Sequence, residues 1–183
     1  MATEPDWNHF RVALSRSSFP AETWDPVLEY FSKEGNDYSA IELVQSTQSR
    51  TWTALKVVTN AFFSTNISAA GAAFYQAGDF KGMAEPVVRA LMRAFKSGAS
   101  ARRELAAMAL KRLEEQAVSA IPEMIEALKN RNEDVRYEAA RVLEVMGTNA
   151  LPAAEALRRA TNDSSVMVQR ASRRALEKVI GGQ

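Results

Sequence analysis

The sequence has 183 residues, of which 46% are hydrophobic and 25% are charged, and its formal net charge at pH 7 is +1. This composition excludes an intrinsically disordered chain, and the small net charge gives the molecule as a whole no preference for polyanions. The chain has no cysteine and a single histidine, His9, which excludes disulfides, cysteine nucleophiles and metal sites built from thiolates or histidine clusters. We therefore expect no metal and no cofactor.

No targeting segment is evident near the N-terminus. Residues 1–7 are acidic and lack the apolar core of a signal peptide. The apolar stretches of the chain are far shorter than the roughly 18–20 residues that a membrane-spanning helix requires. Because a chain without cysteine suits a reducing compartment, we expect a cytoplasmic protein with no membrane partner.

Helix signals begin in the first third of the chain. Asp25 followed by Pro26 predicts an N-cap and a first-turn proline, and Gly35 ends this helix. Asp37 predicts the cap of a second helix. Apolar residues then recur at helical spacing through residues 50–63, which predicts a third helix.

We expect residues 1–66 to form an N-terminal helical cap, because the open end of a repeat stack needs a terminal element to cover it. Within this cap, residues 38–64 are a candidate degenerate repeat. Two interpretations remain for the aromatic residues of the cap, which are either its core or an exposed surface for docking a partner. These residues are Trp7, Phe10, Phe19, Trp24, Tyr30 and Phe31.

A fixed internal period runs through the rest of the chain, and its length of about 33 residues is typical of repeat proteins. A small residue recurs at Ala73, Ala106, Ala139 and Ser172. Four positions further stand Ala77, Leu110, Leu143 and Leu176, and three further again stand Phe80, Leu113, Met146 and Val179. Spacings of four and seven positions mark one face of an α-helix. The small residue predicts a close approach between two helices.

A second series of helices begins at prolines. Pro86, Pro122 and Pro152 each open an apolar pattern, and proline is tolerated in the first turn of a helix. Each repeat is therefore predicted to be a pair of antiparallel helices. The predicted repeats cover residues 67–98, 100–131 and 133–161, followed by a half repeat at 165–180, within a region 67–183 that continues the cap as one domain.

Residues 120–128, with the sequence Ala-Ile-Pro-Glu-Met-Ile-Glu-Ala-Leu, and residues 134–143 strongly resemble a HEAT repeat, especially the bacterial subtype also seen in phycobilin lyases. The resemblance implies an all-α fold, a right-handed α-solenoid of HEAT-like antiparallel helix pairs. It also implies that Asp134 and Arg136 serve packing between repeats and helix capping. By the same resemblance, the second helix of each pair, here called the B helix, lines the concave side.

Enzyme signatures are missing from the sequence. It contains no glycine-rich phosphate loop and no Gly-x-Ser-x-Gly motif. The histidine–glutamate pairs of a HEAT-type di-iron hydroxylase are absent. Trp7, Trp24 and Trp52 all precede the repeats, which disfavours the aromatic site of a HEAT-like DNA glycosylase. We expect a protein that is not an enzyme.

Two charged surfaces are candidate binding sites. The first lies on the B helices, and its mixed signs favour a protein partner; it consists of Arg89, Arg93, Glu123, Glu126, Arg158 and Arg159. The second lies on the last helix, in a half of the chain where residues 86–183 hold 17 Lys and Arg against 12 Asp and Glu. This second set would bind an anion and consists of Arg170, Arg173, Arg174 and Lys178.

The sequence thus predicts a non-catalytic protein–protein interaction or regulatory scaffold module that binds a macromolecular partner on its concave B-helix face. Two alternatives stay open. One is binding of nucleic acid or another anion through the basic C-terminal half. The other is an accessory enzyme subunit of lyase type.

Overall fold

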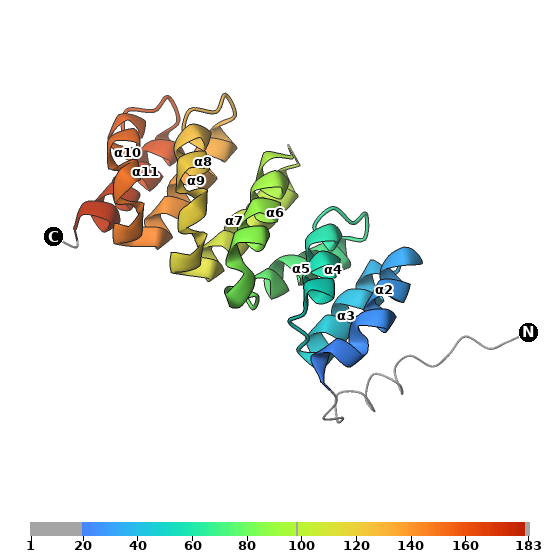
Figure 1. Cartoon of the computed structure of the whole chain (residues 1–183). Helices are drawn as coiled ribbons and strands as arrows, with labels where there is room; N and C mark the ends of the chain where they lie inside the picture. Colours follow the sequence, from blue (N-terminus) through green and yellow to red (C-terminus); the bar gives the residue numbers. More distant parts are fainter. Residues whose placement is uncertain (1–19, 98, 182–183) are drawn as a thin grey trace, which may run out of the picture. The chain divides into compact units, whose positions relative to one another are not determined.

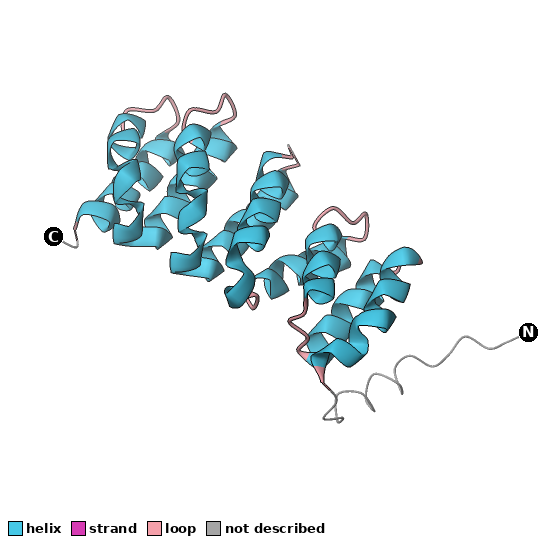
Figure 2. Ribbon diagram, in the orientation of Figure 1, coloured by secondary structure: helices cyan, strands magenta, loops and turns pink. Residues whose placement is uncertain are grey.

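The computed structural model describes residues 20–97 and 99–181. Within these ranges all regular secondary structure is helical and no residue lies in a strand (Figure 2). The predicted fold class, an all-α solenoid, is confirmed. The chain divides into two compact units, residues 1–76 and 77–183. The predicted repeat boundaries, the single continuous domain and the right-handed sense of the stack stay predictions.

The first unit is built from short helices that enclose an apolar core. They are the 3-10 helix η1 (Ala21–Trp24), the α-helices α2 (Asp25–Lys33), α3 (Asp37–Thr47) and α4 (Trp52–Ala61), and all but the last residue of α5 (Ile67–Ala77) (Figure 1). The rings of Phe62 and Phe74 stack with centroids 4.4 Å apart, which ties the end of α4 to α5. The buried amide of Gln76 donates a hydrogen bond of 3.0 Å to the carbonyl of Ile41 in α3.

The N-terminal ends of α2 and α3 differ by one residue from the predicted ones. Helix α3 begins at Asp37, and the cap is Asn36, whose side chain accepts a hydrogen bond of 3.2 Å from the N–H of Ser39. Helix α2 begins at Asp25, directly after η1, and no side chain caps its first turn. The carboxylate of Asp25 instead accepts a hydrogen bond of 2.6 Å from the hydroxyl of Thr51.

The aromatic residues of the predicted cap do not share one environment. Trp24 and Phe31 are buried, at 6% and 5% exposed, as the core interpretation requires. Tyr30 is 54% exposed and meets Phe31 edge-on, so it lies on the surface. The remaining members, Trp7, Phe10 and Phe19, lie outside the described residues.

The second unit consists of two layers of helices (Figure 1). One layer contains α7 (Ser100–Leu113), α9 (Glu133–Met146) and α11 (Val166–Ile180), and each of these helices packs against the next. The other layer contains α6 (Ala84–Lys96), α8 (Ile121–Ala127) and α10 (Ala154–Ala160), together with the 3-10 helices η2 (Lys81–Met83), η3 (Glu114–Ala120) and η4 (Gly147–Ala153). Helix α6 meets η3, and α8 meets η4.

The predicted small positions are buried on the helices of the first layer. Ala106, Ala139 and Ser172 sit on α7, α9 and α11, and each is fully buried. Most positions one and two turns further along these helices are buried as well, namely Leu110, Leu113, Leu143, Met146 and Val179. The exception is Leu176, which is half-buried. The helical face that the internal period predicts is therefore the packed face.

An arginine near the start of α9 joins two consecutive turns. Arg136 donates from Nε and Nη2 to the two carboxylate oxygens of Asp163, at 2.7 and 2.8 Å. Its Nη1 donates to the carbonyls of Asn130 and Arg131, at 2.8 and 3.1 Å. Both charged side chains are almost buried, at 12% and 11% exposed. Arg136 thus has the inter-repeat role that the family resemblance implies.

Asp134, the other residue to which the resemblance assigns a structural role, is mostly exposed and does not cap α9. The cap is Asn132, whose side chain accepts a hydrogen bond of 2.8 Å from the N–H of Asp134. An asparagine two residues before the expected aspartate therefore satisfies the first turn.

Replacing Ala139 with leucine should destabilise the second unit. The added side chain would enter the contact of α9 with its neighbouring helices, and overpacking of this kind costs about 1–3 kcal/mol. Thermal and urea unfolding followed by circular dichroism measure the change. The control is Ala101→Leu, at an exposed position of α7, which should melt like the wild type. Equal melting of the Ala139 variant and the wild type would show that Ala139 is not at a helix crossing.

The pair formed by Arg136 and Asp163 should make stability depend on pH in the acid range. Hydrogen bonds from Arg136 lower the pKa of Asp163 from its ordinary value, and a hydrogen bond from the N–H of Ser165 adds to this shift. Because the folded pKa lies below the unfolded one, this contribution is complete above the unfolded pKa of roughly 4. It is lost as the pH falls through the folded pKa.

Asp163→Asn should therefore lower the free energy of unfolding by about 2 kcal/mol near neutral pH. The difference from the wild type should shrink below about pH 4, where Asp163 becomes protonated during unfolding. Urea titrations at a series of pH values measure both quantities. Glu133→Gln, on the exposed start of α9, is the control and should not reproduce the effect. A difference that is constant down to acid pH would contradict the assignment.

Candidate functional site

Three positions near the N-terminal ends of α7, α9 and α11 are equivalent in the internal period. They follow one another at the internal period, and they are occupied by Arg103 on α7, Arg136 on α9 and Gln169 on α11. At each, the backbone N–H bonds to the carbonyl four positions earlier, over 3.0, 3.3 and 3.0 Å. All three residues therefore lie in the first turn of a helix, and their side chains differ. Gln169 is neutral and donates to the carbonyl of Asp163 at 2.7 Å.

The residue that faces this position also changes between repeats. Asp163, which holds Arg136, has its equivalent one period earlier in Asn130. Each side chain accepts a hydrogen bond from the N–H two positions later, 2.8 Å long from Ser165 and 2.9 Å long from Asn132. The two turns thus have the same conformation. The turn that faces Arg103 presents a neutral amide where the next turn presents a carboxylate.

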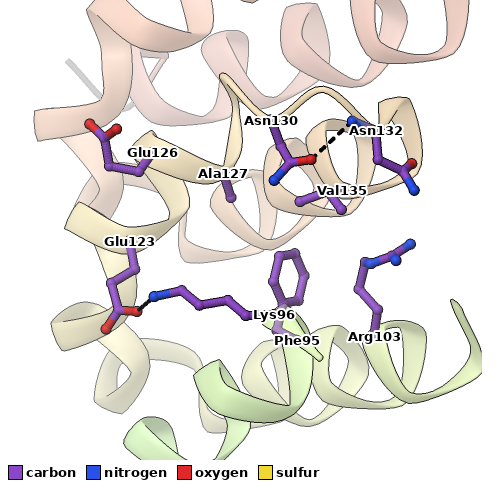
Figure 3. A pocket seen from close by; sticks show the side chains of 9 residues that line it. All are labelled: Phe95, Lys96, Arg103, Glu123, Glu126, Ala127, Asn130, Asn132 and Val135. Carbon is purple, nitrogen blue, oxygen red and sulfur yellow. Dashed lines mark hydrogen bonds and ion pairs between the residues drawn. The ribbon is translucent and has the colours of Figure 1, made fainter. Parts of the chain in front are cut away.

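A cleft of about 340 Å³ opens at this point of the second unit (Figure 3). It lies beside the end of α6, the first turn of α7, and the segment that joins α8 to α9. The residues that line it are Phe95, Lys96, Arg103, Glu123, Glu126, Ala127, Asn130, Asn132 and Val135. Its size is at the lower end of the range of roughly 300–1,000 Å³ that small-ligand sites span.

Arg103 forms one end of the cleft. Its side chain is only 4% exposed, and the carboxylate of Asp134 lies 4.0 Å from its Nη1, beyond hydrogen-bonding distance. The Asp134 side chain is 69% exposed, so water screens its charge. Figure 3 shows Asn130 and Asn132 across the cleft from Arg103. This end therefore combines a buried cation with two neutral amides.

The opposite end of the cleft is acidic but internally compensated. Glu123 of α8 forms an ion pair with Lys96, which crosses from the end of α6 (Figure 3). Glu126 forms a second ion pair, 2.7 Å long, with Lys129. Between the two ends the lining is apolar: Phe95, almost fully buried, stands between Lys96 and Arg103 in Figure 3, and Ala127 and Val135 complete this part.

The residues predicted to bind a partner lie on the surface of α6, α8 and α10, and three of the six pair with a glutamate of their own helix. Arg89 pairs with Glu85 at 2.5 Å, and Arg158 and Arg159 both pair with Glu155, at 2.6 and 3.2 Å. Hydrogen bonds from these two arginines lower the pKa of Glu155. The predicted alternation of positive, negative and positive helices is therefore locally neutralised. Arg93 is exposed on the same helix as Arg89.

The residues predicted to bind an anion lie on α11. Arg170, Arg173 and Lys178 are exposed. Arg174 is turned toward Glu144 of α9, with 3.5 Å between Nε and a carboxylate oxygen. The four cations therefore lie on one helix, and one of them, Arg174, forms an ion pair with a neighbouring helix.

A separate group of charges lies between α7 and α9. Burial lowers the pKa of Lys111 and raises the pKa of Glu138, and the two groups partly compensate each other. Among the described residues, no three His, Cys, Asp or Glu side chains come together in a way that could hold a metal ion. No helix in the described ranges is both long and apolar enough to cross a bilayer.

Sequence reasoning missed the cleft, although a signal for it was available. The apolar positions of the internal period predict only the packed face of the helices. Following the period on the polar positions aligns Arg103 with Arg136 and Asn130 with Asp163, and this comparison exposes the exchange of a carboxylate for an amide. The counter-charges Glu85 and Glu155 could also be predicted from the sequence, because side chains three or four positions apart lie close together on a helix.

Comparisons with known proteins bear on the fold and the family. A family model for HEAT repeats matches residues 88–177. A crystal structure of an engineered protein from the Northeast Structural Genomics Consortium is similar, with a TM-score of 0.52 and 19% identity over 98% of this chain and 94% of that one. At this identity the likeness speaks for the fold alone. No curated protein matches the sequence significantly. With its two-layered stack and the matching family model, the part of the chain that spans residues 88–177 consists of HEAT repeats.

Proposed function

We propose that this protein is a non-catalytic interaction or regulatory scaffold module that binds another protein on the face formed by its B helices α6, α8 and α10. HEAT repeats commonly mediate protein interactions, which supports the general class. The partner and the face are our proposal, and so are a cytoplasmic location and the absence of catalysis.

The observation that carries the proposal is the character of the exposed charges on these three helices. Arginines and glutamates occur together on them, and most are paired over three or four positions, as with Arg89 and Glu85. A surface of alternating and compensated charge attracts a polyanion weakly. It suits a protein surface with the complementary pattern, which gains specificity and association rate from such charges.

A second candidate function is binding of a phosphate-rich ligand by α11. Its support is the cluster of exposed cations Arg170, Arg173 and Lys178, which lie within a few turns of one helix. Contacts to phosphates would make the affinity fall steeply with salt. The third alternative, an accessory subunit of lyase type, rests on the resemblance to phycobilin lyases alone.

Reversing Arg89 and Arg93 to glutamate should weaken binding of a protein partner at least about tenfold, because it inverts the sign of α6 where a partner would meet it. The fold should remain, since surface substitutions change stability by less than about 0.5 kcal/mol. The partner would first be captured with the wild-type chain from the native host and identified. Its affinity for wild type and variant would then be measured by calorimetry at two salt concentrations.

The matched variant is Arg170→Glu with Arg174→Glu, which places the same charge change on α11. It should bind the protein partner like the wild type. Loss of binding in this variant, together with normal binding by the α6 variant, would overturn the proposed face. A steep salt dependence in that case would favour the phosphate-rich ligand.

A further inference from the structure

We propose that α11 binds a second copy of this chain, with the flank of α11 that faces away from α9 packed antiparallel against the same flank of the other copy. This flank is here called the outer flank. It consists of Arg173, Leu176, Glu177 and Ile180, which follow one another at helical spacings of one, three and four positions. The inference is independent of the proposed partner face, which lies on α6, α8 and α10.

The contacts of α11 within the second unit identify the outer flank. Arg174 lies 3.5 Å from a carboxylate oxygen of Glu144, so the flank of α11 that carries Arg174 faces α9. A buried stripe that includes Ala175 and Val179 comes next around the helix. Because an α-helix turns by roughly 100° per residue, Ile180 lies on the opposite side of this stripe from Arg174. Ile180 is 41% exposed, so this flank is open to solvent.

The equivalent flanks of the two preceding helices are covered, because α9 packs on α7 and α11 packs on α9 (Figure 1). One and two periods before Arg173, Leu176 and Glu177 stand Ala140, Leu143 and Glu144 on α9, and Ala107, Leu110 and Lys111 on α7. The four apolar residues of this set are fully buried, whereas Leu176 is only half-buried. The two charged residues meet an opposite charge on the next helix, as Glu144 meets Arg174. The outer flank of α11 is thus a joint surface without its second helix.

Arg173 determines what can cover this flank. It stands at the position where Ala107 and Ala140 are fully buried between neighbouring helices. A further repeat packed in the same way would bury the guanidinium of Arg173, which is costly unless a carboxylate accompanies it. A suitable occupant therefore brings an acidic side chain to Arg173 and an apolar side chain to Leu176.

A second copy of the chain meets both requirements, because the outer flank is complementary to itself. Two antiparallel helices related by a two-fold axis exchange their contacts reciprocally. With the axis near Ala175, Arg173 of each copy faces Glu177 of the other, and the two Leu176 side chains lie between these ion pairs. Both charged side chains are exposed, and among the described residues neither has an ion-pair partner in its own chain. Their order, with the arginine before the glutamate, is also the less favourable one for a pair within a helix.

Sedimentation equilibrium of the full chain at a series of protein concentrations tests the proposal. A contact between two single helices is at the small end of protein interfaces, so we expect a weak dimer that forms at high concentration. A chain that stays monomeric throughout would overturn the inference. Association that continues beyond the dimer would also overturn it, because a two-fold contact closes on itself.

Charge reversals on the outer flank test the predicted pairs. Arg173→Glu and Glu177→Arg should each weaken the dimer at least about tenfold, because each variant places like charges opposite each other at two points. An equimolar mixture of these two single variants should form a mixed dimer about as tight as the wild-type dimer, because every facing pair again has opposite signs. Melting followed by circular dichroism checks that each variant is folded.

The matched control is Lys178→Glu, which makes the same charge change on α11 as Arg173→Glu but on the flank that faces α9. It should dimerise like the wild type. Normal dimerisation of Arg173→Glu, or an equal loss in Lys178→Glu, would show that the outer flank is not the interface. Single variants that stay monomeric when mixed would contradict the antiparallel pairing of Arg173 with Glu177.

Discussion

The close contact between helices α7, α9 and α11 is the constraint on which the second unit depends. Each of the three helices buries one small residue of the internal period, Ala106, Ala139 or Ser172, and we expect the helices to cross there. Because the crossings recur at a constant interval along the chain, the turns that precede these helices stack in register. The arginine of one turn then reaches the acidic side chain of the next, as Arg136 reaches Asp163. The cleft beside Arg103 is the same joint with one partner changed.

The apolar part of this organisation could be predicted from the sequence. Small and aliphatic residues report the packed face of a helix directly, because burial selects for size and hydrophobicity at a fixed spacing. The helix ends were less accessible. Asn36 and Asp37 are both good capping residues, and the choice between them depends on which one leaves the helical conformation. The same holds for Asn132, which caps α9 in place of Asp134.

The polar part was harder to predict because it depends on pairs. A charged residue that the sequence suggests as a binding group is less available to a partner when a neighbour on the same helix neutralises it. Glu155 neutralises Arg158 and Arg159 in this way. The buried position of Arg103 could not be read from its residue type, since arginines are mostly exposed. The signal for its position is the alignment of Arg103 with Arg136 in the internal period.

The layered stack of the second unit also bears on how the chain folds. Each helix of the α7, α9 and α11 layer touches its neighbours in the stack and the short helices between them. Most contacts therefore join residues that are close in sequence, and little loop-closure entropy is lost before they form. Topologies of such low contact order fold fast, often within milliseconds. Because each repeat meets only its neighbours, ordering can begin at any joint and spread along the stack.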